Sequence, residues 1–252
     1  MGKLDDKTAL VTGGGQGIGR GIALALAAEG ATVAVLGRTA EKVEKTAAEV
    51  EERGVASLAI AADMKSDDDI KRAVLSVVDS FGGLDIVINN AQEYGFGPIA
   101  HLDVDQFIAG WESGALGTLR MMRAAHPHLQ AGGGVVVNVS SSVASDPSPA
   151  NAGGYAAVKS AIATLSRAAA VEWAPDGIRV MTLIPFALTP AVEASIEGYD
   201  GLEEQILSQV PLGRFGDAET DIGRVVAFAV SDDARFMIGS TLVVDGGSTH
   251  LT

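Results

Sequence analysis

Cysteine is absent from the sequence, which excludes disulfides, thiolate metal sites and a cysteine nucleophile. No apolar run approaches the roughly 18 to 20 residues that a membrane-spanning helix needs, so we expect no membrane partner. Basic residues are scarce, with 18 Lys and Arg against 32 Asp and Glu and a formal net charge of −14. This excess of acid argues against nucleic acid as a partner, because phosphates favour a basic surface.

Targeting and metal-binding patterns are also missing. Residues 1–7 lack the basic start and long apolar stretch of a secretory signal, so we expect a cytoplasmic protein. The histidines have no ligand-like spacing. The acidic run Asp67-Asp68-Asp69 is typical of a helix N-terminus, where negative charge is favoured. We therefore predict no metal site.

What the chain does contain is a regular alternation of strand-like runs and helix-length segments. Several runs are nearly continuous in Val, Ile, Leu and Ala, as expected for parallel strands covered on both faces. Strands are predicted at 8–12, 32–36, 57–61, 86–89, 135–140, 179–184 and 241–244, and helices at 18–29, 40–53, 68–81, 117–130, 155–173 and 220–231. This order predicts an α/β fold with a doubly wound parallel sheet, right-handed crossovers and helices on both faces.

The domain organisation follows from length and composition. The 252 residues fit one large α/β domain, and we find no linker, internal repeat or low-complexity tract. A single domain is therefore predicted over residues 1–252. Residues 185–216 break the alternation, with helical character but no clear strand. Long excursions after the carboxyl end of a strand lie over the ligand crevice in such sheets, so this stretch is predicted to be a substrate lid.

A glycine-rich loop separates the first strand from the first helix. It reads Gly13-Gly14-Gly15-Gln16-Gly17-Ile18-Gly19. Glycines permit positive φ and let backbone N–H groups approach a pyrophosphate at a helix N-terminus, while Gly19 lets the helix pack close to the strand. At the first βα junction, such a loop predicts dinucleotide binding through Gly13, Gly15, Gln16, Gly17, Ile18 and Gly19.

The end of the second strand indicates which dinucleotide binds. An acidic side chain there would bind the adenosine ribose 2′-hydroxyl of NAD, but this chain has Gly37 followed by Arg38. A guanidinium suits a 2′-phosphate, so NADP(H) is favoured and NAD(H) is the alternative. After the third strand, Asp63 either accepts a hydrogen bond from the adenine or caps the next helix. Its neighbour Met64 is predicted to contact the cofactor with it.

Tyr155 and Lys159 open the helix after the fifth strand and, four residues apart, share one helical face. A free phenol has a pKa of about 10, and a neighbouring ammonium lowers that pKa, which makes the tyrosine a usable acid or base. Ser140, Ser141 and Ser142 each offer a hydroxyl to hold the substrate oxygen. Beside a phosphate loop, this pattern predicts acid–base chemistry.

These residues resemble the short-chain dehydrogenase/reductase family, and the likeness covers nearly the whole chain. The matching elements, in order, are Thr12-Gly13-x3-Gly17-Ile18-Gly19, Asn89-Asn90-Ala91, the serine cluster, Tyr155-x3-Lys159 and Val244-Asp245-Gly246-Gly247. The resemblance implies a seven-stranded Rossmann sheet and a homotetramer or homodimer. It also implies hydride exchange between a nicotinamide and a small-molecule alcohol or carbonyl substrate.

The resemblance further implies roles for single residues. Tyr155 is the acid/base, Lys159 binds the nicotinamide ribose, and cofactor contacts are implied for Asn90, Ala91, Pro185 and Thr189. The usual spacing before Tyr155 gives Ser142 as the catalytic serine, whereas counting three residues on from Asn138 gives Ser141. We favour Ser141, with Ser142 as the alternative.

Three positions depart from the family pattern. The usual asparagine of the helix between the fourth and fifth strands is Gly114, and the space this leaves is expected to hold water. Gln92 stands where the family has glycine, and Phe186 follows Pro185 where the family also has glycine. We expect an altered proton relay and a reshaped nicotinamide pocket on an unaltered fold.

The sequence thus predicts an NAD(P)-dependent oxidoreductase that acts on a secondary alcohol or ketone. Four aromatic residues fall in loops at the carboxyl edge of the sheet, where they either line a fairly apolar substrate pocket or simply pack: Tyr94, Phe96, Phe186 and Tyr199. The alternative, motivated by Gly114, is a cofactor-binding relative impaired in catalysis, with a regulatory or assembly role.

Overall fold

The computed structural model describes residues 2–145 and 151–249. Seven strands within these residues form one parallel sheet in the order β3-β2-β1-β4-β5-β6-β7. The strands are β1 (Thr8–Thr12), β2 (Thr32–Gly37), β3 (Ser57–Ala61), β4 (Ile86–Asn89), β5 (Val135–Val139), β6 (Arg179–Pro185) and β7 (Thr241–Val244). The predicted doubly wound α/β fold is confirmed.

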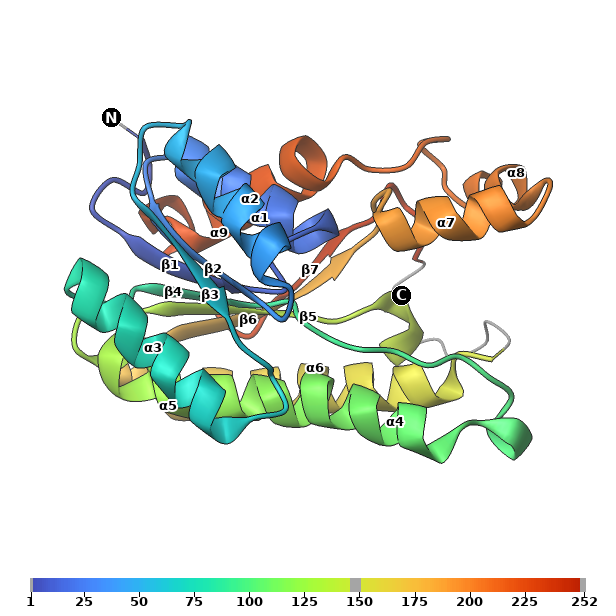
Figure 1. Cartoon of the computed structure of the whole chain (residues 1–252), viewed down its shortest axis with the longest axis horizontal. Coiled ribbons are helices and arrows are strands. Elements are labelled where there is room, and N and C mark those ends of the chain that lie inside the picture. The colour runs from blue at the N-terminus through green and yellow to red at the C-terminus, as the bar shows by residue number, and fades with distance from the viewer. Residues whose placement is uncertain (1, 146–150, 250–252) are drawn as a thin grey trace.

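Helices cover both faces of the sheet (Figure 1). One layer contains α1 (Gly17–Ala28), α2 (Ala40–Glu51) and α9 (Arg224–Val230). The other contains α3 (Asp67–Phe81), α5 (Gly117–Gln130) and α6 (Gly153–Trp173). In the described ranges, no helix has the length and apolar character needed to cross a membrane.

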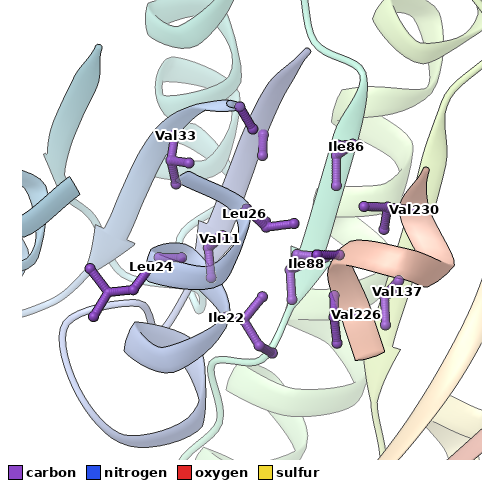
Figure 2. Packing of buried hydrophobic residues seen from close by; sticks show 14 of the residues in the cluster. Val11, Ile22, Leu24, Leu26, Val33, Ile86, Ile88, Val137, Val226 and Val230 are labelled. Atoms are coloured by element: carbon purple, nitrogen blue, oxygen red, sulfur yellow. The ribbon is translucent and has the colours of Figure 1, made fainter. Parts of the chain in front are cut away.

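The central strands are largely apolar because successive side chains enter opposite cores. In β1, Val11 packs with Ile22 of α1 and Val226 of α9, whereas Leu10 faces the layer of Val74 and Met121. Figure 2 shows the first of these cores, where side chains from α1 and α9 meet over the central strands. The two cores fix the sheet between its helical layers, and so fix the carboxyl ends of the strands.

The helix predicted at 220–231 differs in its first half. Residues Ala218–Gly223 form a π-helical turn, η5, and the regular helix α9 begins only at Arg224. The turn lies close to α1, where a Cβ on Gly223 would stand 2.6 Å from the Ala25 Cβ and 2.7 Å from the Gly21 oxygen. Apolar periodicity predicts helical character, but the wider turn depends on this close approach, which periodicity does not report.

The carboxyl ends of the parallel strands meet at one edge, and the strand order reverses there between β1 and β4. After β6, helices α7 (Pro190–Gly198) and α8 (Leu202–Leu207) extend past this edge on the side of α1 and α2. Helix α4 (Val104–Trp111) extends past it on the side of α5 and α6 (Figure 1). The carboxyl edge of the sheet thus lies between two helical projections.

Arg179, at the start of β6, ties this strand to the end of α9. Its guanidinium donates hydrogen bonds to the carbonyl oxygens of Ala229, Val230, Ser231, Ala234 and Met237. A cation is favoured at a helix C-terminus, where the last carbonyl groups have no partner within the helix.

We predict that Arg179→Met lowers the free energy of unfolding by about 2–3 kcal/mol, because it leaves these carbonyl groups without their charged donor. Urea denaturation measures this change. The exposed Arg235 gives the matched control, and Arg235→Met should leave the midpoint unchanged. Equal midpoints for the two variants would contradict the prediction.

Candidate cofactor and active site

A cavity of about 460 Å³ opens at the carboxyl edge of the sheet. It extends from the residues after β2 and β3 to those after β5 and β6, across the point where the strand order reverses. The predicted site residues that line it are Gly13, Gly15, Gln16, Gly17, Ile18, Arg38, Asp63, Met64, Asn90, Ala91, Ser141, Tyr155, Lys159, Pro185 and Thr189. Gly19 and Ser142 are the predicted site residues outside this lining.

The glycine loop has the geometry that a pyrophosphate needs. Gly13 and Gly17 have φ of 64° and 53°, in the left-handed region that favours glycine. Gly19 is buried, and a Cβ there would stand 2.5 Å from Asn90 Nδ2 and against the Gly13 oxygen. Gly19 therefore serves the packing of α1 on the loop, while Gly13 and Gly17 shape the surface toward the cavity.

Asn90 braces this loop from the end of β4. Its amide donates to the backbone oxygens of Thr12 (3.0 Å) and Gly13 (3.2 Å). The Thr12 hydroxyl in turn accepts from the backbone N–H groups of Asn90 (3.0 Å) and Ala91 (3.1 Å). Asn90 lines the cavity, but these contacts make it first a support for the loop.

Three cations lie at the end of the cavity next to β2 and β3. Lys42, in the first turn of α2, lines the cavity and donates to Gln16 Oε1 at 2.5 Å. Arg38 Nη1 lies 2.6 Å from Glu93 Oε1, and Lys65 Nζ lies 2.9 Å from the same oxygen. Positive charge is therefore concentrated at this end of the cavity, where the carboxylate of Glu93 pairs with two of the three cations.

Asp63 does not cap α3, so that alternative was wrong, and its predicted contact with the adenine stays a prediction. Its Oδ1 accepts from the backbone N–H of Lys65 at 2.9 Å, which stabilises the turn before α3. The residue also lines the cavity, together with Met64. Ser66 is the N-cap of α3 and accepts from the Asp69 N–H, so Asp67, Asp68 and Asp69 occupy the first turn of a helix as expected.

The side chains of Tyr155 and Lys159 lie at the far end of the cavity. Lys159 is buried; its Nζ donates to the Val139 oxygen at 2.7 Å and lies 5.5 Å from the centroid of the Tyr155 ring. Burial lowers the pKa of Lys159 to about 7. Burial also raises the pKa of Tyr155 to about 12, against the lowering effect of its hydrogen bond with Ser141.

These values differ from the expectation that the ammonium lowers the pKa of the phenol. Desolvation disfavours both charged forms and is the largest cause of both pKa shifts, and neither group contributes to the shift of the other. The consequence is that Lys159 changes its protonation close to neutral pH.

The three serines of the cluster occupy different environments. Ser141 lines the cavity and is hydrogen-bonded to Tyr155. Ser142 begins a short 3₁₀ turn, η3 (Ser142–Ala144). Ser140 is buried, and its hydroxyl donates to the Lys159 oxygen at 3.1 Å. Of the two candidates, the geometry brings Ser141 to Tyr155.

Aromatic rings surround Tyr155 on the open side. The centroids of Phe96 and Tyr94 lie 5.4 Å and 6.1 Å from that of Tyr155, and 5.5 Å from each other. Phe186 instead stacks on Phe215 at 5.4 Å. Tyr199 ends α7 and is exposed. Tyr94 and Phe96 therefore belong to the active-site end, whereas Phe186 packs against the segment that follows α8.

Two of the three departures from the family pattern, Gly114 and Gln92, lie next to each other in the structure. The expected open space is not there, because the Gln92 side chain fills it: a Cβ on Gly114 would lie 2.9 Å from Gln92 Cδ. The departures at 92 and 114 therefore compensate each other in volume. Within residues 2–145 and 151–249, no group of three or more His, Asp or Glu side chains is placed to hold a metal ion.

Known proteins match this chain over almost its full length. A family model described as enoyl-(acyl carrier protein) reductase matches residues 13–249. A 12α-hydroxysteroid dehydrogenase from Clostridium sp. is 40% identical over 255 residues, covering 98% of each chain. The chain belongs to the short-chain dehydrogenase/reductase family.

Two further members extend the comparison. A 3-oxoacyl-(acyl-carrier-protein) reductase from Staphylococcus aureus is 37% identical over 243 residues, covering 96% of this chain and 97% of its own. The crystal structure of a short-chain dehydrogenase from Burkholderia cenocepacia in complex with NADP has a TM-score of 0.90 and 33% identity, covering 98% and 99% of the two chains. This short-chain dehydrogenase/reductase is thus an NAD(P)-binding oxidoreductase.

Sequence reasoning missed Lys42 and Glu93 in the lining of the cavity. The signal for Lys42 was available, since a cation in the first turn of the helix after β2 faces the neighbouring glycine loop in this fold. Glu93 gave no such signal, because its pairing with Arg38 joins loops 55 residues apart.

The lowered pKa of Lys159 predicts a pH-dependent stability. The unfolded chain keeps this proton up to the ordinary value of 10.5, whereas the folded protein releases it near 7. Between these values the unfolded state binds more protons, so the free energy of unfolding rises with pH. Urea denaturation from about pH 7 to pH 9.5 should show this rise, and Lys159→Met should remove it. A variant that keeps the full rise would show that another group causes it.

Proposed function

We propose that this protein interconverts a secondary alcohol and a ketone on a bulky apolar substrate, with NADP(H) as its preferred cofactor and Tyr155 as general acid/base. One observation carries the proposal: Tyr155, hydrogen-bonded to Ser141 and beside the buried Lys159, shares one cavity with the glycine loop. Neither half would suffice alone, since the loop binds nucleotides in many enzymes and the pair is common on helices.

The residues of the cavity fit a nicotinamide dinucleotide. Gly13 and Gly17 have the positive φ that lets backbone approach a pyrophosphate. The cavity lining extends from Arg38 after β2 to Tyr155 on α6, across the reversal of strand order where dinucleotides bind in such sheets. When bound, the nicotinamide supplies or accepts the hydride. Pro185 and Thr189 would lie at its carboxamide end, and Lys159 at its ribose.

The protein supplies the proton. In the reducing direction, the Ser141 hydroxyl donates a hydrogen bond to the carbonyl oxygen, where negative charge develops. The Tyr155 hydroxyl gives that oxygen its proton, and the phenolate left behind is stabilised by the Lys159 ammonium. A pKa of about 7 lets Lys159 carry a proton at neutral pH and pass it on. Oxidation runs these steps in reverse.

Substrate class is inferred from the walls of the site. Tyr94 and Phe96 are 52% and 56% exposed and flank Tyr155 with open aromatic surface. Such surface favours a rigid apolar substrate over a small polar one. The 40% identity with a 12α-hydroxysteroid dehydrogenase makes steroid ketones the first compounds to test.

The single domain and the lid are part of the same proposal. Residues 185–216 carry α7 and α8 beyond the carboxyl edge, next to a cavity that already includes Thr189, Pro190 and Ala191. This position suits a segment that covers the substrate. We further propose a homotetramer or homodimer, supported by exposed apolar side chains at Val104, Ile108 and Phe236.

A second candidate function is a catalytically impaired, cofactor-binding relative, and Gly114 favours it. Absorbance assays over a panel of ketones separate the two. Tight NADPH binding without turnover of any carbonyl compound would support the impaired relative. Turnover of at least one ketone supports the enzyme.

We predict that Tyr155→Phe lowers kcat by at least about 10²-fold, because the proton donor is lost while the ring remains. The Kd for NADPH, measured by fluorescence, should change little. Ser76→Ala, which removes an exposed hydroxyl on α3 outside the cavity lining, is the control and should retain activity. Retained turnover in Tyr155→Phe would eliminate the proposed acid/base.

We predict opposite effects at the two partners of the Arg38–Glu93 pair. Arg38→Asp removes a cation and adds repulsion, so the ratio of NADPH to NADH affinity should fall at least about tenfold. Glu93→Gln removes the carboxylate that competes with a 2′-phosphate, so NADPH affinity should rise. Isothermal titration with both cofactors measures each ratio. An unchanged ratio in Arg38→Asp would exclude the phosphate contact.

A further inference from the structure

The segment after β4 rests on a π-helical turn, η2 (Glu112–Leu116), between α4 and α5. The Glu93 backbone N–H donates to the Ser113 hydroxyl at 2.9 Å, and that hydroxyl donates to the Ala109 oxygen at 2.7 Å. This anchor brings residue 92 next to Gly114. A π-helical turn within a longer helical stretch is often found at functional sites.

Gly114, Gln92 and Val158 pack against one another where residue 92 meets η2. A Cβ on Gly114 would stand 2.7 Å from Val158 Cγ1, 2.9 Å from Gln92 Cδ and 3.1 Å from Gln92 Cγ. Only a glycine at position 114 leaves room for Gln92 and Val158 together. Gln92 is therefore held in place by packing from η2 on one side and from the helix of Lys159 on the other.

The amide of Gln92 has no hydrogen-bond partner among the described residues. Both its Oε1 and its Nε2 are buried and unpaired. Each buried polar group without a partner costs about 1–3 kcal/mol, so most such groups bind water or a ligand. Gln92 lines the same cavity as Lys159, so its amide adds an unpaired acceptor and an unpaired donor to the site that also contains the lysine.

The Lys159 ammonium also has hydrogen-bond donors without a protein partner in the part of the chain that the structure describes. Its ammonium carries three donors, of which the Val139 oxygen accepts one. The titratable group that faces it is Tyr155 on its own helix, and Tyr94, from the segment after β4, contacts Tyr155 in turn. Burial alone accounts for its lowered pKa, with no carboxylate contributing. Polar groups that solvate this ammonium must then come from the cavity.

We propose that Gln92 is a positioning residue whose side-chain amide holds the water that exchanges protons with Lys159. This inference rests on the proposed function. Each reduction of a ketone consumes one proton from solvent, which passes from water to Lys159, on to the Tyr155 phenolate and, in the next turnover, to the substrate oxygen. Oxidation releases one proton by the same route in reverse. Gln92 holds the water at the start of this route, and the absence of a side chain at Gly114 leaves room for Gln92.

The first test is Gln92→Leu, which keeps volume and removes both polar atoms. We expect kcat to fall at least about tenfold with little change in KM or in the Kd for NADPH, and the pH profile of kcat to shift. Gln92→Glu keeps an acceptor and should recover part of the rate. Gln130→Leu, at an exposed position of α5, is the control and should match the unmodified enzyme.

A readout without turnover tests the same idea in the protein alone. If water on Gln92 solvates the ammonium, Gln92→Leu lowers the pKa of Lys159 further, so the rise of stability with pH should begin at a lower pH than in the unmodified protein. Above the pKa of Lys159, where the folded protein no longer carries this charge, Tm should change little, because leucine keeps the volume of glutamine.

An exchange of positions separates relay from packing. Gly114→Asn alone should lower Tm and activity, because the new side chain meets Gln92 and Val158. The triple variant Gln92→Gly, Gly114→Asn, Val158→Ala returns an amide to this place from η2 and removes both obstacles, so it should recover Tm and much of kcat. If the triple variant recovers Tm but keeps the low kcat of Gln92→Leu, an amide at this place is not enough to hold the water, and the proposed role is contradicted.

The outcomes also distinguish the inference from the proposed function. Full kcat and an unmoved pH profile in Gln92→Leu would overturn the role of Gln92 while leaving Tyr155 as acid/base. Failure of the unmodified protein to reduce any ketone would overturn the proposed function. In that case the shift in pH-dependent stability still decides whether the amide solvates Lys159. A loss of NADPH affinity without a pH effect would make Gln92 a direct cofactor contact and would overturn the water-binding role.

Discussion

The burial of the Lys159 ammonium is the constraint on which the site depends. The lysine lies on α6, donates to the last residue of β5 and faces a cavity at the carboxyl edge of the sheet. A buried cation without a paired carboxylate is tolerated only where polar partners reach it. The fold brings the Val139 oxygen and the Tyr155 ring to it, and we propose that water held by the Gln92 amide is its third partner. The same burial that costs stability sets a pKa suited to proton transfer.

The fold and the cofactor loop could be predicted from the sequence because their signals are local. Continuous apolar strands, the glycine loop and the Tyr155–Lys159 spacing each depend on residues close together in the chain, and the structure gives the expected sheet around them. The π-helical start of the helix at 218–230 was not predictable, since it depends on the approach of Gly223 to Gly21. The pKa values were predicted in the wrong direction for Tyr155, because burial cannot be read from spacing.

The contact between Gln92 and Gly114 shows most clearly what could not be predicted from the sequence. Each departure was visible in the sequence, and each taken alone indicates damage to the site. Only the structure shows that one side chain enters the space left by the other, with Val158 closing the third side. A pair that compensates in volume argues for retained chemistry more than for decay, because two unpaired buried atoms would otherwise have no reason to persist.

The central claim is that hydride passes between NADP(H) and the carbon of a ketone in this cavity. The most direct measurement uses NADPH that carries deuterium at the transferred position of C4, together with a steroid ketone, and locates the label in the product by mass spectrometry. The account predicts one deuterium on the carbinol carbon and a hydroxyl proton drawn from solvent. A reduced product without deuterium on that carbon, or no reduced product with any ketone despite bound NADPH, would contradict it.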